Sequence, residues 1–174
     1  SYFCQMPIET VTFRGVNYPA FQADGNAARF ALPFAKEVLK EGIIFDIGYG
    51  REEWKFPGAI GIDKNCKDED LRDAMNLPLN YADGIFSSHC LEHLNDWVAH
   101  LNHWTDCLRS GGVMFLYLPH WNQLYWRPYS NRKHINAFVP DMIKDYFVAS
   151  GKYKNIFVSE LDAYNSFTAF AEKI

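Results

Sequence analysis

The feature that most constrains the fold is a pair of short apolar runs, each of which carries an acid near its end. Residues 43–47 read Ile-Ile-Phe-Asp-Ile and lead into Gly48, Tyr49 and Gly50, while residues 59–63 read Ala-Ile-Gly-Ile-Asp. Short continuous apolar runs are typical of strands buried on both faces of a parallel sheet. Glycines directly after such a strand let the backbone approach a ligand, and an acid ending the next strand can accept hydrogen bonds from a ribose diol. The pattern therefore predicts a nucleoside site at the carboxyl edge of a doubly wound sheet.

Length and composition favour one globular domain. The chain of 174 residues is 48% hydrophobic and 22% charged, so we expect a single domain over 1–174 with an irregular segment at 1–24. No apolar run approaches the roughly 20 residues of a membrane-spanning helix, and we expect no membrane association. The four cysteines lack Cys-x-x-Cys spacing and predict reduced thiols in a cytoplasmic protein. The net charge of −4 argues against general nucleic-acid binding.

Patterns of apolar residues predict strands that alternate with helices. The predicted strands cover residues 43–47, 59–63, 71–73, 84–88 and 113–118. The predicted helices cover residues 24–42, 96–111 and 140–151. Gly42 is expected to cap the first helix, and alternating runs at 153–160 and 166–173 predict an antiparallel pair. We therefore expect an α/β fold: a doubly wound, Rossmann-like, mostly parallel seven-stranded sheet with helices on both faces and an antiparallel C-terminal edge hairpin.

Five short motifs follow one another along this framework. They occupy residues 45–50, 61–63, 73–78, 82–94 and 108–113, which read FDIGYG, GID, DAMNLP, ADGIFSSHCLEHL and LRSGGV. With these motifs in this order, the chain resembles the class I S-adenosylmethionine-dependent methyltransferases, most of all their small type 11 members, over roughly residues 25–174. The resemblance implies S-adenosylmethionine as the cofactor and S-adenosylhomocysteine as its product.

The resemblance also implies a set of cofactor contacts along the carboxyl edge of the sheet. The residues so implied are Asp46, Gly48, Tyr49, Gly50, Asp63, Lys64, Asp73, Ala74, Ser88 and His89. Asp63 is implied to hold the ribose, and Asp73 with the backbone amide after it is implied to frame the adenine. Asp46 is expected to accept from the ammonium group of the methionine moiety, directly or through water, while Gly48 and Gly50 give the backbone access to it.

The first motif departs from the family pattern in one respect. Glu52 stands where a third glycine is usual, and residues 51–58 contain Trp54 and Pro57 and show little helical pattern. We therefore expect the first crossover helix to be short or absent. This disfavours NAD, whose pyrophosphate needs a helix N-terminus, but it does not disfavour S-adenosylmethionine, which has no phosphate.

Residues 89–93, His-Cys-Leu-Glu-His, also fit the H-x-x-E-H pattern of some metal-dependent proteases. That interpretation requires both histidines on one face of a helix, but this stretch follows a strand and the next helix begins only near Asp96. We therefore expect no metal site and interpret Glu92 and His93 as residues that hold the loop. The two histidines of the following helix are expected to face solvent.

Residues 119–134 form an aromatic loop after the strand at 113–118, where loops of this fold class lie over the cofactor cleft. Flat aromatic rings can stack on sugars or bases, and arginine can bind an anionic group. The residues predicted to contact substrate are Trp121, Tyr125, Trp126, Arg127 and Tyr129. His120 and His134 are the candidate general bases, because histidine titrates near neutral pH. The alternative is a lid whose aromatics only cover a small core.

The sequence thus predicts an enzyme that transfers a methyl group to an oxygen or nitrogen of a small-molecule or saccharide-like acceptor. One alternative is a regulatory module that binds S-adenosylmethionine without transfer activity. Another is a nucleic-acid methyltransferase. The chain has Ser87-Ser88-His89-Cys90 where the amino-methylating nucleic-acid enzymes carry an Asn-Pro-Pro-Tyr or Asp-Pro-Pro-Tyr tetrad, which argues against the last alternative.

Overall fold

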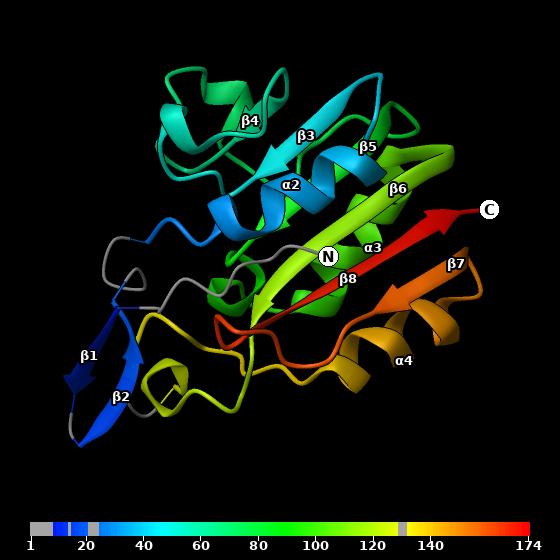
Figure 1. Ribbon diagram of the computed structural model, residues 1–174. Coiled ribbons are helices and arrows are strands. Elements are labelled where there is room, and N and C mark those ends of the chain that lie inside the picture. Colours follow the sequence, from blue (N-terminus) through cyan, green and yellow to red (C-terminus); the bar gives the residue numbers. More distant parts are fainter. Residues whose placement is uncertain (1–8, 14, 21–24, 129–131) are drawn as a thin grey trace.

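The computed structural model describes residues 9–13, 15–20, 25–128 and 132–174. Its main feature is a six-stranded sheet with the strand order β4-β3-β5-β6-β8-β7 (Figure 1). These strands are β3 (Ile44–Ile47), β4 (Ile60–Ile62), β5 (Ala82–Ser88), β6 (Leu108–Pro119), β7 (Tyr153–Val158) and β8 (Ser166–Lys173). The first four strands in this order run parallel, whereas β8 is antiparallel to both β6 and β7. The predicted Rossmann-like fold with an antiparallel C-terminal pair is confirmed.

The predicted strand at 71–73 is wrong, so the sheet has six strands rather than seven among the described residues. The segment instead contains a short 3₁₀ helix, η2 (Glu69–Leu71). The carboxylate of Asp68 accepts from the backbone N–H of Asp70 at 3.0 Å, and the Arg72 guanidinium donates to the carbonyl of Cys66 at 2.6 Å. These local hydrogen bonds hold the segment in tight turns, so β4 is left as the edge strand.

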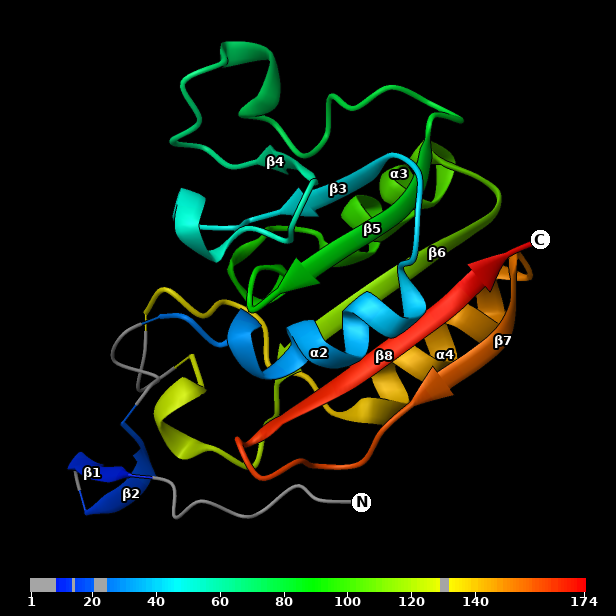
Figure 2. The same cartoon turned by 45° about the horizontal axis from the view of Figure 1, so that its top comes forward.

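Helices cover both faces of the sheet, as predicted. Helix α2 (Ala28–Val38) lies on one face, and α3 (Trp97–Cys107) and α4 (Pro140–Ser150) lie on the other (Figures 1 and 2). The α2 face buries one apolar cluster, which includes Ala31, Ala35, Phe86 and Phe115. The opposite face buries a larger cluster, which includes Leu101, Trp104, Ile143 and Phe147. Burial on both faces explains why the central strands are almost continuously apolar.

The helix boundaries follow local capping chemistry. The Asp96 carboxylate accepts from the Ala99 backbone N–H at 3.1 Å and starts α3, while Gly151 ends α4 with a left-handed φ of 67°. The prediction that Gly42 caps the first helix is wrong, because α2 already ends at Val38. At Gly42 a Cβ atom would lie 2.2 Å from Oδ2 of Asp83, so the glycine is required by the close approach of that carboxylate.

Two features lie outside the main sheet. Residues expected to be irregular contain a two-stranded antiparallel hairpin, β1 (Thr10–Phe13) and β2 (Val16–Pro19), so that expectation is wrong for these residues. Strand β2 lies beside the 3₁₀ helix η4 (Leu124–Trp126) of the aromatic loop (Figures 1 and 2). Among the described residues, no helix combines the length and the apolar character that crossing a membrane would require.

Candidate active site

A cavity of about 650 Å³ opens at the carboxyl ends of β3, β4 and β5. Its volume lies within the about 300–1,000 Å³ typical of small-molecule sites. Six of the ten predicted cofactor residues line it: Gly48, Asp63, Lys64, Asp73, Ala74 and His89. Asp46, Tyr49, Gly50 and Ser88 do not. The structure thus brings most of the predicted set into one cleft, at the edge where a doubly wound sheet is expected to bind its ligand.

The loop after β3 crosses directly under the cleft. It is connected to β4 by 3₁₀ helix η1 (Glu52–Trp54), so the expected absence of a long first crossover helix is confirmed. Gly48 has a φ of 77° and donates its N–H to the carbonyl of Ile62 at 2.7 Å. A Cβ atom at Gly48 would lie 2.5 Å from the Sγ atom of Cys90, so only glycine lets this loop pass the segment after β5.

Asp63 joins the loop that follows β3 to the turn that follows β4. Its Oδ2 accepts from the backbone N–H of Gly50 at 3.2 Å, and its Oδ1 accepts from that of Asn65 at 3.0 Å. A carboxylate oxygen has two lone pairs, so each oxygen keeps acceptor capacity that ribose hydroxyls could use. The side chain is only partly buried and lines the cavity. This geometry fits the role that the sequence pattern predicts for it.

Asp46 has a different place from the one expected of a side chain that meets the cofactor directly. It is 1% exposed, and its Oδ2 accepts from the backbone N–H of Phe56 at 2.8 Å. Burial raises the pKa of Asp46 to about 7. The carboxyl group therefore anchors the loop between β3 and β4 through Phe56. A contact between Asp46 and the cofactor through water stays a prediction.

The other three predicted residues that miss the cavity support its edge. The ring of Tyr49 covers Gly61, where a Cβ atom would approach a ring carbon of Tyr49 to 2.4 Å. Gly50 supplies the N–H that Asp63 accepts. The hydroxyl of Ser88 is buried and has no hydrogen-bond partner among the described residues.

Side chains of α3 hold the turn that contains Asp73 and Ala74. The indole Nε1–H of Trp104 donates to the carbonyl of Ala74 at 3.0 Å, and Nε2 of His103 accepts from the backbone N–H of Leu77 at 3.1 Å. Asp73 accepts from the backbone N–H of Met75 at 2.8 Å and stabilises the same turn. His100 lines the cavity. The prediction that both histidines of this helix face solvent is therefore wrong, because the segment before β5 folds back over α3.

His89 lines the cleft from the segment that follows β5. Its Nε2 lies 3.0 Å from Oγ of Ser166, its ring stacks on Tyr117 at 5.4 Å, and the edge of Trp126 contacts it at 5.1 Å. Burial, with the neighbouring His134 and His93, lowers the pKa of His89 to about 3. The ring is therefore neutral at physiological pH, and it separates the cofactor cleft from the aromatic loop.

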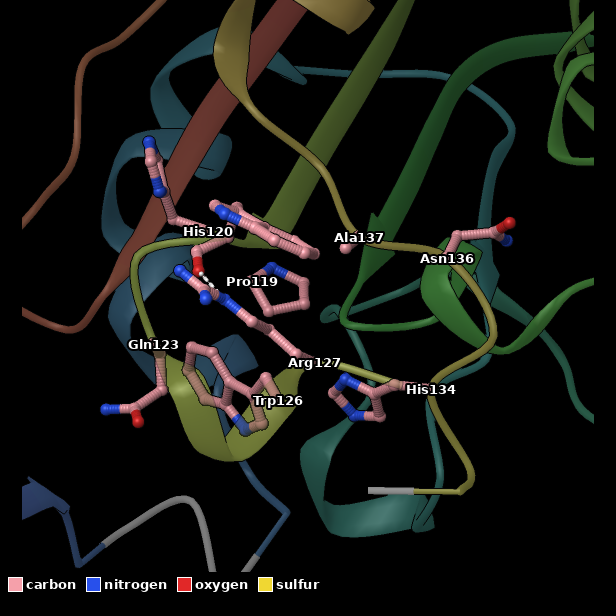
Figure 3. A pocket seen from close by; sticks show the side chains of 9 residues that line it. Pro119, His120, Gln123, Trp126, Arg127, His134, Asn136 and Ala137 are labelled. Atoms are coloured by element: carbon pink, nitrogen blue, oxygen red, sulfur yellow. Dashed lines mark hydrogen bonds between the residues drawn. The ribbon is translucent and has the colours of Figure 1, made fainter. Parts of the chain in front are cut away.

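The residues predicted to contact substrate differ in burial. Trp126 is 6% exposed, whereas Trp121 is 41% exposed and has the Arg127 guanidinium 4.0 Å from its ring centroid. Arg127 also donates to the Trp121 carbonyl at 2.8 Å (Figure 3). Tyr125 lies in η4 without a described side chain, and Tyr129 lies outside the described residues. Among the side chains of this set that the structure describes, Trp126 has a ring contact with His89, which lines the cleft.

The two candidate bases lie at opposite ends of a small cavity of about 10 Å³ (Figure 3). The Nδ1 atom of His120 accepts from the backbone N–H of Asn122 at 2.9 Å, and burial lowers its pKa. His134 is 6% exposed and packs against His93, with ring centroids 4.7 Å apart. Because His93 lines the cofactor cleft, His134 is the candidate closer to it.

Sequence reasoning missed several residues of the cleft. His93, Cys90 and Leu94 line it, and Glu92, which precedes His93 in the sequence, is fully buried. Among the described residues, Glu92, His93 and His134 form the one group whose donor atoms lie close enough together to hold a metal ion. The H-x-x-E-H pattern contains two of these three residues, Glu92 and His93. Its first histidine, His89, is not part of the group.

Comparison with protein-family models places the chain in a known class. Residues 23–152 match the model of a family described as a methyltransferase domain. The chain therefore belongs to this methyltransferase family. No curated protein matches the sequence.

Solved structures share the fold at low sequence identity. An S-adenosylmethionine-dependent methyltransferase from Archaeoglobus fulgidus has a TM-score of 0.64 at 17% identity, covering 88% of this chain and 97% of that one. A Thermotoga maritima S-adenosylmethionine-dependent methyltransferase, described as a possible histamine N-methyltransferase, has a TM-score of 0.65 at 16% identity, covering 88% and 93%. A Burkholderia thailandensis 1,6-didemethyltoxoflavin N1-methyltransferase, solved with S-adenosylhomocysteine, has a TM-score of 0.63 at 14% identity, covering 88% and 81%. The predicted class, an S-adenosylmethionine-dependent methyltransferase, is confirmed.

Proposed function

We propose that this enzyme methylates an oxygen or nitrogen atom of a small-molecule or saccharide-like acceptor. Two of the structural relatives are described as small-molecule N-methyltransferases, acting on 1,6-didemethyltoxoflavin and possibly on histamine. Because their sequence identity to this chain is low, these relatives support the class of the acceptor but do not indicate which molecule it is.

The observation that carries the proposal is the contribution of two chemically different groups of residues to one cleft. Asp63 and Asp73 line it from the segment that follows β4, and His89, His93 and Lys133 line it from the segment that follows β5 and from the aromatic loop. The acids are suited to the nucleoside of the cofactor, which leaves the histidines and Lys133 for the acceptor. S-adenosylmethionine supplies an activated methyl group on a sulfonium when it is bound. The chain therefore has mainly to align the acceptor and exclude water, which proximity and orientation accomplish.

The histidines offer neutral donors and acceptors suited to a compact polar molecule. His89 is held neutral by burial and is fixed by Tyr117 and Trp126. Lys133 adds a positive charge at the exposed rim of the cleft. Of the two candidate bases, the position of His134 beside His93 supports a role at the acceptor better than the position of His120. Trp121 and Arg127 are proposed to contact the acceptor only at the outer surface of the loop.

A panel assay tests the proposal. The full chain is incubated with S-adenosylmethionine and separate sets of hydroxylated sugars, phenols, amines, nitrogen heterocycles and short oligonucleotides. S-adenosylhomocysteine formation and the mass of each acceptor are then followed. We expect one methyl group to be added to members of a small-molecule set, and Asp63→Ala to abolish the gain at limiting cofactor. Methylation of the oligonucleotides alone would contradict the proposal.

A further inference from the structure

Three polar side chains meet between the part of the cleft proposed for the acceptor and the aromatic loop. Glu92 and His93 belong to 3₁₀ helix η3 (Leu91–His93), and His134 comes from the end of the aromatic loop. One donor atom from each lies within 4.8 Å of the others, and Nε2 of His93 is 3.4 Å from Oε1 of Glu92. His134 lies beside Trp126 in Figure 3.

The carboxylate in this group is fully buried, and the ionisable side chain it contacts is His93. Glu92 is 0% exposed, and neither of its oxygens has a hydrogen-bond partner among the described residues. The contact with His93 lacks hydrogen-bond geometry, although the two atoms are close. A buried carboxylate without hydrogen bonds is strongly unfavourable unless a proton, a protonated neighbour or a bound cation compensates its charge, so Glu92 requires one of these.

A backbone carbonyl orients the ring of His93, and the ring of His134 keeps one buried nitrogen without a partner among the described residues. The Nδ1 atom of His93 lies 2.6 Å from the carbonyl oxygen of Lys133. A carbonyl oxygen only accepts, so Nδ1 carries the proton and Nε2, the atom close to Glu92, is left to bind a cation. The Nδ1 atom of His134 is buried and has no hydrogen-bond partner among the described residues, so it can supply the second nitrogen ligand.

Hydrogen bonds of the backbone hold the loop against η3 and fix this convergence. The Glu92 carbonyl accepts from the N–H groups of Ile135 at 2.9 Å and Asn136 at 3.0 Å. The Asn136 side-chain amide donates to the carbonyls of Leu91 at 3.1 Å and Leu94 at 2.7 Å. The residues directly after His134 are thus fastened to both ends of η3. The three donors are preorganised, which is the condition for a ligand site rather than a chance contact.

We propose that Glu92, His93 and His134 bind one divalent transition-metal cation, with Zn²⁺ as the best match to the ligand set. Two imidazole nitrogens and one carboxylate, with a further position open, form a common set for catalytic zinc, and the same set also suits Fe²⁺ and Co²⁺. Bonds of about 2.0–2.2 Å place tetrahedral donors roughly 3.4 Å apart, which the pair of Glu92 and His93 already satisfies. Metal-bound histidines typically donate their other N–H to a backbone carbonyl or carboxylate, as His93 does to the carbonyl of Lys133.

The position of this site gives the cation a specific use. His93 is both a proposed ligand and a residue that lines the cleft, so the cation would lie beside the part of the cleft proposed for the acceptor. A cation there would hold and polarise an oxygen of the acceptor. His134 would then act as a ligand rather than as a general base. This use rests on the proposed function, whereas binding of the cation does not.

Titration of the full chain with Co²⁺ tests the site without cofactor or acceptor. Protein treated with a chelator and desalted is titrated with CoCl₂ while visible absorption is recorded, and ZnCl₂ is then added. We expect d–d bands that saturate at one equivalent and vanish when Zn²⁺ displaces the cobalt. A wild-type protein without a saturable band, and without stoichiometric Zn²⁺ binding in calorimetry, overturns the proposal whatever the variants do.

Variants locate the site. His134→Gln, Glu92→Gln and His93→Gln should each weaken Zn²⁺ binding at least about tenfold, while the control His100→Gln, which lines the same cleft outside the group, should not. The melting temperature reports whether each variant is folded. Equal Zn²⁺ affinity in the wild type and a folded His134→Gln would overturn the assignment. Methyl transfer at full rate by stringently metal-free enzyme would overturn the role in acceptor binding and leave the proposed function intact.

Discussion

The carboxylate of Asp63 accepts the backbone N–H of Gly50 at 3.2 Å, so the acid that ends β4 fastens the glycine loop that follows β3. The same carboxylate faces the cavity. One side chain thus serves the architecture of the cleft and is available to a ribose. This double use explains why two motifs separated along the sequence behave as one unit in the fold.

Gly48 should tolerate no side chain. In Gly48→Ala the new Cβ would lie 2.5 Å from Sγ of Cys90 and would also force a left-handed φ on alanine. Gly111→Ala is the matched control, because Gly111 has a φ of 83° but open space around a Cβ. We expect Gly111→Ala to cost about 1 kcal/mol of unfolding free energy and Gly48→Ala to cost at least about 2 kcal/mol more. Urea unfolding measures both, and equal losses would mean that the loop shifts away from Cys90 freely.

Asp46 should make stability depend on pH. Its pKa rises from 3.8 to about 7 in the folded protein. A carboxyl group with a raised folded pKa contributes most below its unfolded pKa, and this contribution is lost as the pH rises through the folded value. Wild type should therefore lose stability relative to Asp46→Asn between about pH 4 and pH 7, by up to about 1.4 kcal/mol per pH unit. Chemical unfolding of both proteins at several pH values measures the difference in unfolding free energy. A difference that does not change with pH would mean that the pKa of Asp46 is not raised in the folded protein.

The two tryptophans of the aromatic loop should respond differently to truncation. Trp126 is buried against His89, so Trp126→Ala should lower the free energy of unfolding by about 3–5 kcal/mol. Trp121 is largely exposed, so Trp121→Ala should leave stability within about 0.5 kcal/mol of wild type. If the outer surface of the loop contacts the acceptor, Trp121→Ala should raise the KM for the acceptor and leave cofactor affinity unchanged. An unaltered KM would remove Trp121 from the acceptor site.

The two candidate histidines can be separated by their effect on turnover. His134→Gln should lower kcat by roughly 10²-fold or more, the usual effect of removing a group that activates the acceptor. His120→Gln should change kcat by less than about twofold, because its Nδ1 is already bonded to Asn122 and the ring does not line the cofactor cleft. Single-turnover rates with saturating cofactor make the comparison. The reverse order of effects would move the acceptor toward His120.

Much of the fold was predictable because it rests on local patterns. The strand at 166–173 was predicted with its observed boundaries, and Asp96 and Gly151 mark helix ends by ordinary capping chemistry. The predicted strand at 71–73 rested on a single apolar residue, Leu71, and the hydrogen bonds of Asp68 and Arg72 hold this segment in turns instead. The hairpin at 10–19 was missed for a related reason, since four-residue strands leave almost no periodicity to detect.

Site residues were predictable where a single sequence motif specifies them. They were not predictable where the site is formed by segments far apart in the sequence. Gly48, Asp63 and Asp73 fall on the cleft as the motifs indicate. The group of Glu92, His93 and His134 depends on how the aromatic loop folds back onto η3, which the hydrogen bonds of Asn136 determine. The spacing of residues along the sequence does not reveal the contact between these two segments.

The most direct test of the account is calorimetric titration of S-adenosylhomocysteine into wild type, Asp63→Ala and the control Asp70→Ala. Asp70 is an exposed acid of the neighbouring η2 that does not line the cavity. We expect stoichiometric binding to wild type and to Asp70→Ala, and a loss of about 1–3 kcal/mol in binding free energy for Asp63→Ala, because the ribose hydroxyls lose a charged acceptor. Equal affinity in all three proteins, with Asp63→Ala folded, would contradict the assignment of this cleft as the cofactor site.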